Sequence, residues 1–157
     1  MIDSITECLY RSSLQKMFEI GSTAMLTNSS PAHARIVYDE FFKHAKGYVK
    51  IFCNTLSIDI FDNQAVFNSA KSALDRKVII KCYVQAQSTD AVNFPKLLGN
   101  NLKTAVGPDK KFNFMVMDSC ALRFESEKGR ISAQVYTNNK EIAQVLDNCF
   151  ELLYHGQ

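Results

Sequence analysis

The stretch K-F-N-F-M-V-M-D-S-C-A-L-R-F-E, residues Lys111–Glu125, decides the fold. An apolar run ends in Asp118, and a second β-rich run follows after two residues. Aspartate favours tight turns because its carboxylate accepts hydrogen bonds from nearby backbone amides. We therefore expect two adjacent strands, Phe112–Met117 and Ala121–Ser126, joined by a turn at Asp118.

Helices and strands alternate on both sides of this pair. Apolar residues at helical spacing predict helices over residues 4–26, 34–46, 62–74, 90–98 and 139–154. Runs rich in β-branched and aromatic residues predict strands over residues 48–54, 78–84, 102–106 and 131–137. This order predicts a single α/β domain with a mixed, largely parallel sheet flanked by helices.

Composition limits the class of protein. The chain has 157 residues, enough for one domain, and 46% of them are apolar, which is too many for a disordered chain. The net charge of +2 excludes a strongly basic nucleic-acid binder.

The cysteines and the N-terminus indicate a compartment. Five widely spaced cysteines without a Cys/His cluster suggest reduced core thiols and no structural zinc. The start M-I-D-S-I-T-E-C lacks the features of a signal peptide, and no apolar run is long enough for a membrane span. We expect a cytoplasmic protein without a cofactor or metal.

The order of elements from Ile36 to Leu153 resembles one half of the phospholipase D superfamily. The segments L-D-R-K-V-I-I-K, residues 74–81, and F-M-V-M-D, residues 114–118, carry most of the resemblance. It implies a phospholipase D-like half over residues 33–157, preceded by an N-terminal helical extension over residues 1–27.

The family's active site has the pattern His-x-Lys-x4-Asp, in which two copies act on one phosphodiester. In the family the histidine is the nucleophile or the acid, the lysine binds phosphate and the aspartate helps to orient the site. Aligned on Asp118, this chain has Lys111 at the histidine position and Asn113 at the lysine position. A lysine, with an ordinary pKa of about 10.4, is a poor substitute for imidazole. The family's Gly-Ser-x-Asn segment is also absent, so the resemblance implies a domain without catalysis.

The remaining candidate residues each allow two interpretations. Lys111 belongs to a loop that either grips an anion or is a solvated turn. Arg123 and Glu125 share one strand face, and they form either a charge network with Asp118 in a vestigial cleft or an exposed pair. Asp118 either shapes a turn or keeps a phosphate-site role. Asn54 follows the first parallel strand, where ligands approach open α/β sheets, or it caps a helix.

Histidine and cysteine offer weaker candidates for catalysis. His33, His44 and His155 fall on helices or near the C-terminus rather than beside Asp118. Cys120 is near the candidate site but has no evident histidine partner, so we interpret it as a structural thiol.

These observations lead to two hypotheses. The first is a noncatalytic domain that binds a protein partner as a regulatory, inhibitory or adaptor subunit, with bacterial or phage defence or counter-defence as the suggested setting. Weak phosphate or nucleic-acid binding and a homodimer are further expectations, the dimer by analogy with single-half family members. The alternative is a phosphodiesterase or nuclease with a nonstandard site. A third option is an assembly module that uses the N-terminal helix.

Overall fold

The computed structural model describes residues 2–85, 89–105, 112–126 and 132–156, with side chains from Ser4 onward. Its strands are β1 Met25–Asn28, β2 Tyr48–Cys53, β3 Ile79–Gln85, β4 Leu102–Ala105, β5 Phe112–Met117, β6 Ala121–Ser126 and β7 Ala133–Tyr136. Its helices are α1 Ile2–Ile20, α2 Pro31–His44, α3 Ile58–Phe61, α4 Gln64–Asp75, α5 Asn93–Leu98 and α6 Lys140–His155, with a 3₁₀ turn at Gly99–Asn101.

The strands form one mixed sheet in the order β1-β7-β6-β5-β2-β3-β4. Strands β2, β3 and β4 are parallel, whereas β5 pairs antiparallel with β2 and the remaining pairs toward β1 are antiparallel. The mixed α/β fold predicted from the sequence is confirmed, but the sheet is not largely parallel as expected, because four of its six strand pairs are antiparallel. The two strands of the opening stretch pair along their whole length, from Phe112 opposite Ser126 to Met117 opposite Ala121.

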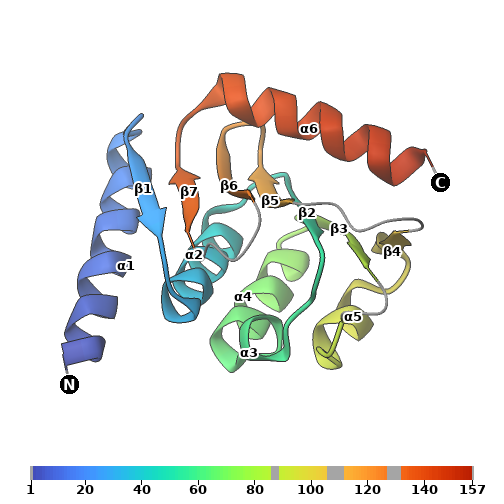
Figure 1. The fold of residues 1–157 in the computed structure, drawn as a ribbon, viewed down its shortest axis with the longest axis horizontal. Coiled ribbons are helices and arrows are strands. Elements are labelled where there is room, and N and C mark those ends of the chain that lie inside the picture. The colour runs from blue at the N-terminus through green and yellow to red at the C-terminus, as the bar shows by residue number, and fades with distance from the viewer. Residues whose placement is uncertain (1, 86–88, 106–111, 127–131, 157) are drawn as a thin grey trace.

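Helices cover both faces of the sheet (Figure 1). On one face lie α2, α4 and α5, with α1 packed beside α2, and this side contains the larger hydrophobic cluster. On the other face α6 lies across the sheet over a cluster rich in aromatic side chains, which includes Phe52, Phe114 and Phe150. Among the described residues no helix has the length and hydrophobicity needed to cross a membrane.

The N-terminal region differs from the prediction. The helix expected over residues 4–26 ends at Ile20, and Met25–Asn28 forms the edge strand β1 instead. Gly21, with φ of 64°, provides the left-handed residue at which the helix stops. Because β1 pairs with β7, the expected boundary at residue 27 falls inside a strand of the sheet.

Side chains near the two ends of α4 join it to α5 and to α2. Asn63, rather than Asp62, caps α4 by accepting hydrogen bonds from the amides of Ala65 and Val66. Asp62 instead accepts hydrogen bonds from three backbone amides at the start of α5. Arg76, the C-cap residue of α4, donates to carbonyls at the end of α2. Asn139 caps α6 by accepting a hydrogen bond from the amide of Ile142.

Candidate functional site

A network of polar side chains lies at the sheet edge where β2 ends and β5 begins. The Asn113 side-chain oxygen accepts a hydrogen bond from the Asn54 amide at 2.7 Å. The Asn113 side-chain nitrogen donates to Glu125 at 3.5 Å, consistent with the pairing of these residues across β5 and β6. Glu125 is also 3.5 Å from the Arg123 guanidinium. The structure therefore brings together four of the predicted site residues.

Arg123 is the buried member of this network. Only 7% of its side chain is exposed, and its Nε donates to Asn28 of β1 at 2.8 Å. Its guanidinium lies over the Tyr38 ring, 5.5 Å from the ring centre. Burial raises the pKa of the Tyr38 hydroxyl, and the charge of Arg123 partly offsets that effect. Glu125, Asn28 and Tyr38 together compensate a charge that would be costly to bury alone.

Asp118 lies at the opposite end of β5. It is five positions after Asn113, which corresponds to about 17 Å along a strand. Its carboxylate accepts hydrogen bonds at 2.8 Å from the amides of Lys46, Gly47 and Tyr48, in the loop between α2 and β2. A Cβ added to Gly47 would lie 3.1 Å from the carboxylate, so the loop approaches closely because glycine is there. The carboxylate thus bonds a distant loop rather than its own turn.

Lys111 lies outside the described residues, as do the neighbouring Asp109 and Lys110. The prediction that this loop grips an anion therefore falls outside the described residues.

The three histidines contact other parts of the chain. His33 stacks on Tyr10 and His44 stacks on Phe18, each with ring centres 4.1 Å apart. His155 lies 2.8 Å from Glu151 on α6. In the described part of the chain, none of these rings has an interaction with Asn113 or Asp118.

Metal and thiol chemistry gain no support from the described residues. No group of three or more His, Cys, Asp or Glu side chains in this part of the chain could hold a metal ion. The Cys120 thiol lies 3.3 Å from the Asn138 side-chain oxygen and 3.7 Å from the Thr137 carbonyl, so it bonds to the turn before α6.

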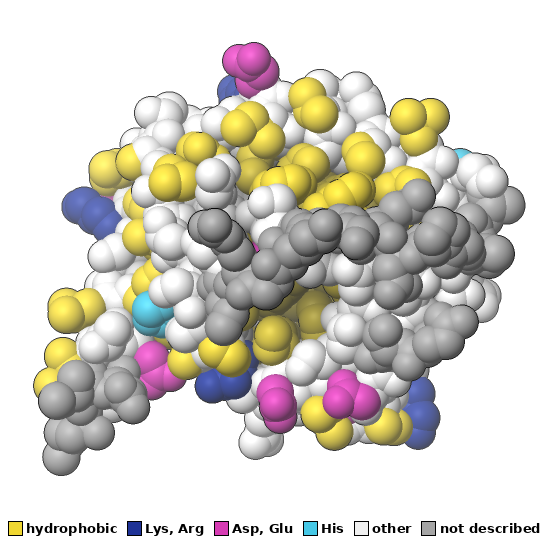
Figure 2. Space-filling view, in the orientation of Figure 1, with side chains coloured by type: hydrophobic (Ala, Val, Ile, Leu, Met, Phe, Trp, Pro, Cys, Tyr) yellow, Lys and Arg dark blue, Asp and Glu magenta, His cyan; other side chains and the backbone are white. Residues whose placement is uncertain are grey.

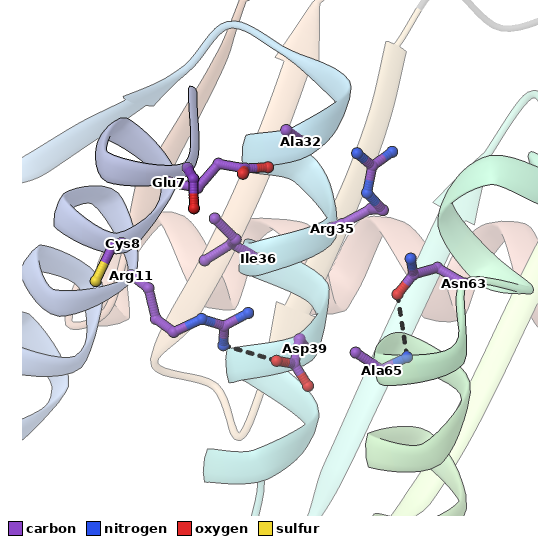
Figure 3. A pocket seen from close by; sticks show the side chains of 10 residues that line it. Glu7, Cys8, Arg11, Ala32, Arg35, Ile36, Asp39, Asn63 and Ala65 are labelled. Atoms are coloured by element: carbon purple, nitrogen blue, oxygen red, sulfur yellow. Dashed lines mark hydrogen bonds and ion pairs between the residues drawn. The ribbon is translucent and has the colours of Figure 1, made fainter. Parts of the chain in front are cut away.

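A groove between α1 and α2 was missed by the sequence analysis. It encloses about 390 Å³, and Glu7 and Arg11 extend into it from α1 (Figure 3). Arg11 pairs at 2.7 Å with Asp39 on α2 and also contacts Glu40. Both carboxylates are almost fully buried, at 2% and 1% exposure. Arg35 also lines the groove and has no polar partner among the described residues.

Burial raises the pKa of Asp39, but hydrogen bonds from Ser69, Arg11 and Lys43 outweigh it and hold the pKa below its usual range. Asp39 therefore stays ionised and anchors α1 to α2. The sequence did contain one signal for this groove. It is the acidic pair D-E at residues 39–40, inside the otherwise apolar stripe of a helix.

The fold is that of known phospholipase D family members. No protein-family model and no curated protein sequence matches the chain. Among solved structures, it is similar to Nuc from Salmonella typhimurium, a phospholipase D family member, with a TM-score of 0.65 and 14% identity over 83% of this chain and 93% of Nuc. It is also similar to NucT from Helicobacter pylori, with a TM-score of 0.60 and 11% identity over 83% of this chain and 94% of NucT.

A third similar structure covers more of the chain. TrmBL2, an archaeal chromatin protein described as having a novel mode of DNA binding, aligns with 98% of this chain and 62% of its own length. The TM-score is 0.61 and the identity is 12%. The likeness to Nuc and NucT gives the chain a phospholipase D-like fold, as the sequence resemblance implied.

Proposed function

We propose that the chain is a noncatalytic phospholipase D-like domain that acts by binding, as a regulatory, inhibitory or adaptor subunit. The observation that carries this proposal is the environment of Asn113. Its side chain occupies the position that the resemblance assigns to the phosphate-binding lysine. It is bonded within the chain, to the Asn54 amide and to Glu125.

The charges at this edge point to the same conclusion. Arg123, the buried cation there, is occupied by Asn28 and Glu125. No histidine bonds to the network, so the described residues supply no imidazole for nucleophilic or acid–base chemistry. In this proposal the site recognises a partner but lacks the imidazole with which the family's pattern cleaves a phosphodiester.

The rival hypothesis is a phosphodiesterase that uses Lys111, Asp118 and Glu125. Glu125 pairs with Asn113, which lies about 17 Å from Asp118 along the strand. This distance between Asp118 and Glu125 disfavours that set. An enzyme would need its groups at one edge. Glu125 is therefore the better residue with which to test catalysis.

The test is a cleavage assay with bis(p-nitrophenyl) phosphate and with single-stranded and duplex DNA. It is run with magnesium and with a chelator, on the wild type and on Glu125→Gln. We expect wild-type turnover equal to that of the buffer. Cleavage that is lost in Glu125→Gln, in a variant with unchanged circular dichroism, would establish the rival hypothesis.

We also propose that any nucleic-acid binding is weak and electrostatic. TrmBL2, which has a similar fold, binds DNA, whereas this chain carries a net charge of only +2. Because the binding is electrostatic, the affinity for a fluorescent DNA duplex should fall as salt rises from 50 to 200 mM. The fall should be about tenfold, because few phosphate contacts are available. A salt-independent, tight complex would contradict this part of the proposal.

A protein partner and a homodimer complete the proposed function. The dimer is suggested by the resemblance to single-half family members, in which two chains join so that their half-sites face each other. In this chain each half-site lacks the catalytic pattern, so dimerisation would serve assembly rather than catalysis.

A further inference from the structure

A second cavity adjoins the groove between α1 and α2. The groove of about 390 Å³ and this cavity of about 630 Å³ are both lined by Glu7, Ala32 and Arg35, so the two spaces meet at these residues. Figure 2 shows acidic and basic side chains near the start of α2, with hydrophobic side chains between them. The groove and the cavity together, here called the joined groove, have the size of a small-molecule site.

The four charged side chains that line the groove are not all paired. Arg11 pairs with Asp39. The side chains of Glu7 and Arg35 are half-buried, and neither has an ion pair or a hydrogen bond in the described part of the chain. Figure 3 shows Glu7 on the side of α2 that faces α1 and Arg35 on the side that faces α4. The fold thus holds one carboxylate and one guanidinium apart across α2.

A second hydrogen-bond donor lies on the Arg35 side of the groove. The Asn63 side-chain oxygen accepts hydrogen bonds from the amides of Ala65 and Val66 at 3.1 and 3.3 Å. These bonds fix the side-chain amide, so its nitrogen points away from Ala65, on the side of Arg35 (Figure 3). The α4 side of the groove therefore presents N–H donors from two residues, an arrangement that suits a carboxylate.

The wall of the second cavity contains an unsatisfied polar atom. His33 lines this cavity, and its Nδ1 is buried with no hydrogen-bond partner among the described residues. The Ser30 hydroxyl, which accepts a hydrogen bond from the His33 amide at 3.1 Å, lines the same cavity and keeps its own hydrogen to donate. Buried polar atoms without partners are rare in folded proteins and require an explanation. A polar ligand in the joined groove provides one.

We propose that the joined groove binds a small zwitterion, an amino acid or a short peptide, across α2. The ligand carboxylate bonds to Arg35 and Asn63, and the ligand ammonium pairs with Glu7. Ala32 and Ile36 form an apolar floor beneath the atoms between the two charges. A ligand with a single charge would leave the other half-buried charge without a partner, and for this reason the ligand carries both. This site goes beyond the proposed function and does not depend on it.

The first test is calorimetric titration of the wild type with glycine, glycylglycine and triglycine. These probes carry the same two charges and differ in the distance between them, by about 3.5 Å per residue at most. We expect at least one probe to bind with a dissociation constant below about 1 mM. The preferred length distinguishes a free amino acid from a peptide. Absence of binding by all three probes up to about 10 mM would overturn the proposal.

The second test removes the two protein charges one at a time. Arg35→Gln and Glu7→Gln should each weaken binding of the preferred probe at least about tenfold. Lys71→Gln on α4 and Glu19→Gln on α1 are matched controls, because both side chains are exposed and neither lines the groove. The controls should bind the probe as the wild type does. Unchanged binding in Arg35→Gln or in Glu7→Gln would overturn the proposal.

The third test assigns each end of the ligand to its residue. The N-acetylated form of the preferred probe lacks the ammonium, and its amide form lacks the carboxylate. The wild type should bind each form at least about tenfold more weakly than the zwitterion. Loss of the ammonium should have little further effect in Glu7→Gln, and loss of the carboxylate should have little further effect in Arg35→Gln. An N-acetylated probe that binds the wild type as tightly as the zwitterion would overturn the proposal.

These outcomes are separate from failure of the proposed function. Absence of zwitterion binding leaves the noncatalytic role intact, whereas phosphodiester cleavage would remove that role and leave this site untouched. Circular dichroism of every variant confirms that the protein is folded.

Discussion

At the scale of single residues, Asp118 has the clearest structural role. It adopts φ of 54° and is followed by Ser119 at 53°, a left-handed conformation that aspartate tolerates better than most residues. Its two carboxylate oxygens bind three consecutive amides of the loop between α2 and β2. One side chain thus joins segments about 70 residues apart.

Replacing this carboxylate should cost stability. Asp118→Ala removes three charge-assisted hydrogen bonds, and we expect the free energy of unfolding to fall by about 2–4 kcal/mol. Asp118→Asn retains an acceptor oxygen and the left-handed tolerance, so its loss should be smaller. Urea denaturation measures both. An Asp118→Ala protein within about 0.5 kcal/mol of the wild type would contradict this role.

Arg11 should contribute to the stability of the fold, because it neutralises two buried carboxylates. Its side chain is 32% exposed, so solvent screens part of the interaction, and we expect Arg11→Gln to cost about 1–3 kcal/mol. Arg35→Gln is a matched control on the same groove. Arg35 has no polar partner among the described residues, so its loss should cost no more than about 0.5 kcal/mol. Equal effects in the two variants would contradict the pairing.

The same cluster predicts a pH dependence. The pKa of Asp39 is lowered in the folded state, so its contribution to stability is present above the unfolded value of about 3.9. That contribution is lost as the pH falls through the lower folded value. In Arg11→Gln the folded pKa should rise and this loss should begin at higher pH. Thermal unfolding measured from pH 3 to pH 7 tests this, and identical profiles for the two proteins would refute it.

At the scale of elements, β1 connects the N-terminal region to the candidate site. It pairs with β7 over four residues, and its last residue, Asn28, accepts the Arg123 hydrogen bond. The sequence did not predict this strand, because the run M-L-T-N is short and ends at the turn residues S-S-P. Pairing with a strand more than 100 residues away determines its conformation, and local propensity contains no information about that contact.

The bond between β1 and Arg123 can be tested directly. Asn28→Ala leaves a buried guanidinium donor without its acceptor, and we expect a cost of about 1–3 kcal/mol in chemical denaturation. Ser29→Ala changes an exposed neighbour and should be close to neutral. If Asn28→Ala were also neutral, β1 would not hold Arg123 in place.

The sequence predicted the candidate site unevenly. Asn54, Asn113, Arg123 and Glu125 were candidates for one site together with Asp118, and the structure brings the first four together but not Asp118. The opposite position of Asp118 was not anticipated, although five residues of extended strand carry a side chain from one edge of a sheet to the other. The contacts of the histidines depend on how α1 packs on α2, which periodicity alone does not determine.

At the scale of the whole molecule, the sheet and its helices resemble those of Nuc and NucT. A fold can host unrelated functions, so the chemistry of the site decides the function. Our proposal, that this chain binds rather than cleaves, therefore rests on the contacts of Asn113 and its neighbours and not on the fold.

Native mass spectrometry of the protein purified gently from its own cells tests the central claim most directly. The account predicts a second polypeptide in stoichiometric amount, bound to one or two copies of this chain. A bare chain or a bare homodimer that also cleaves a phosphodiester would contradict the account.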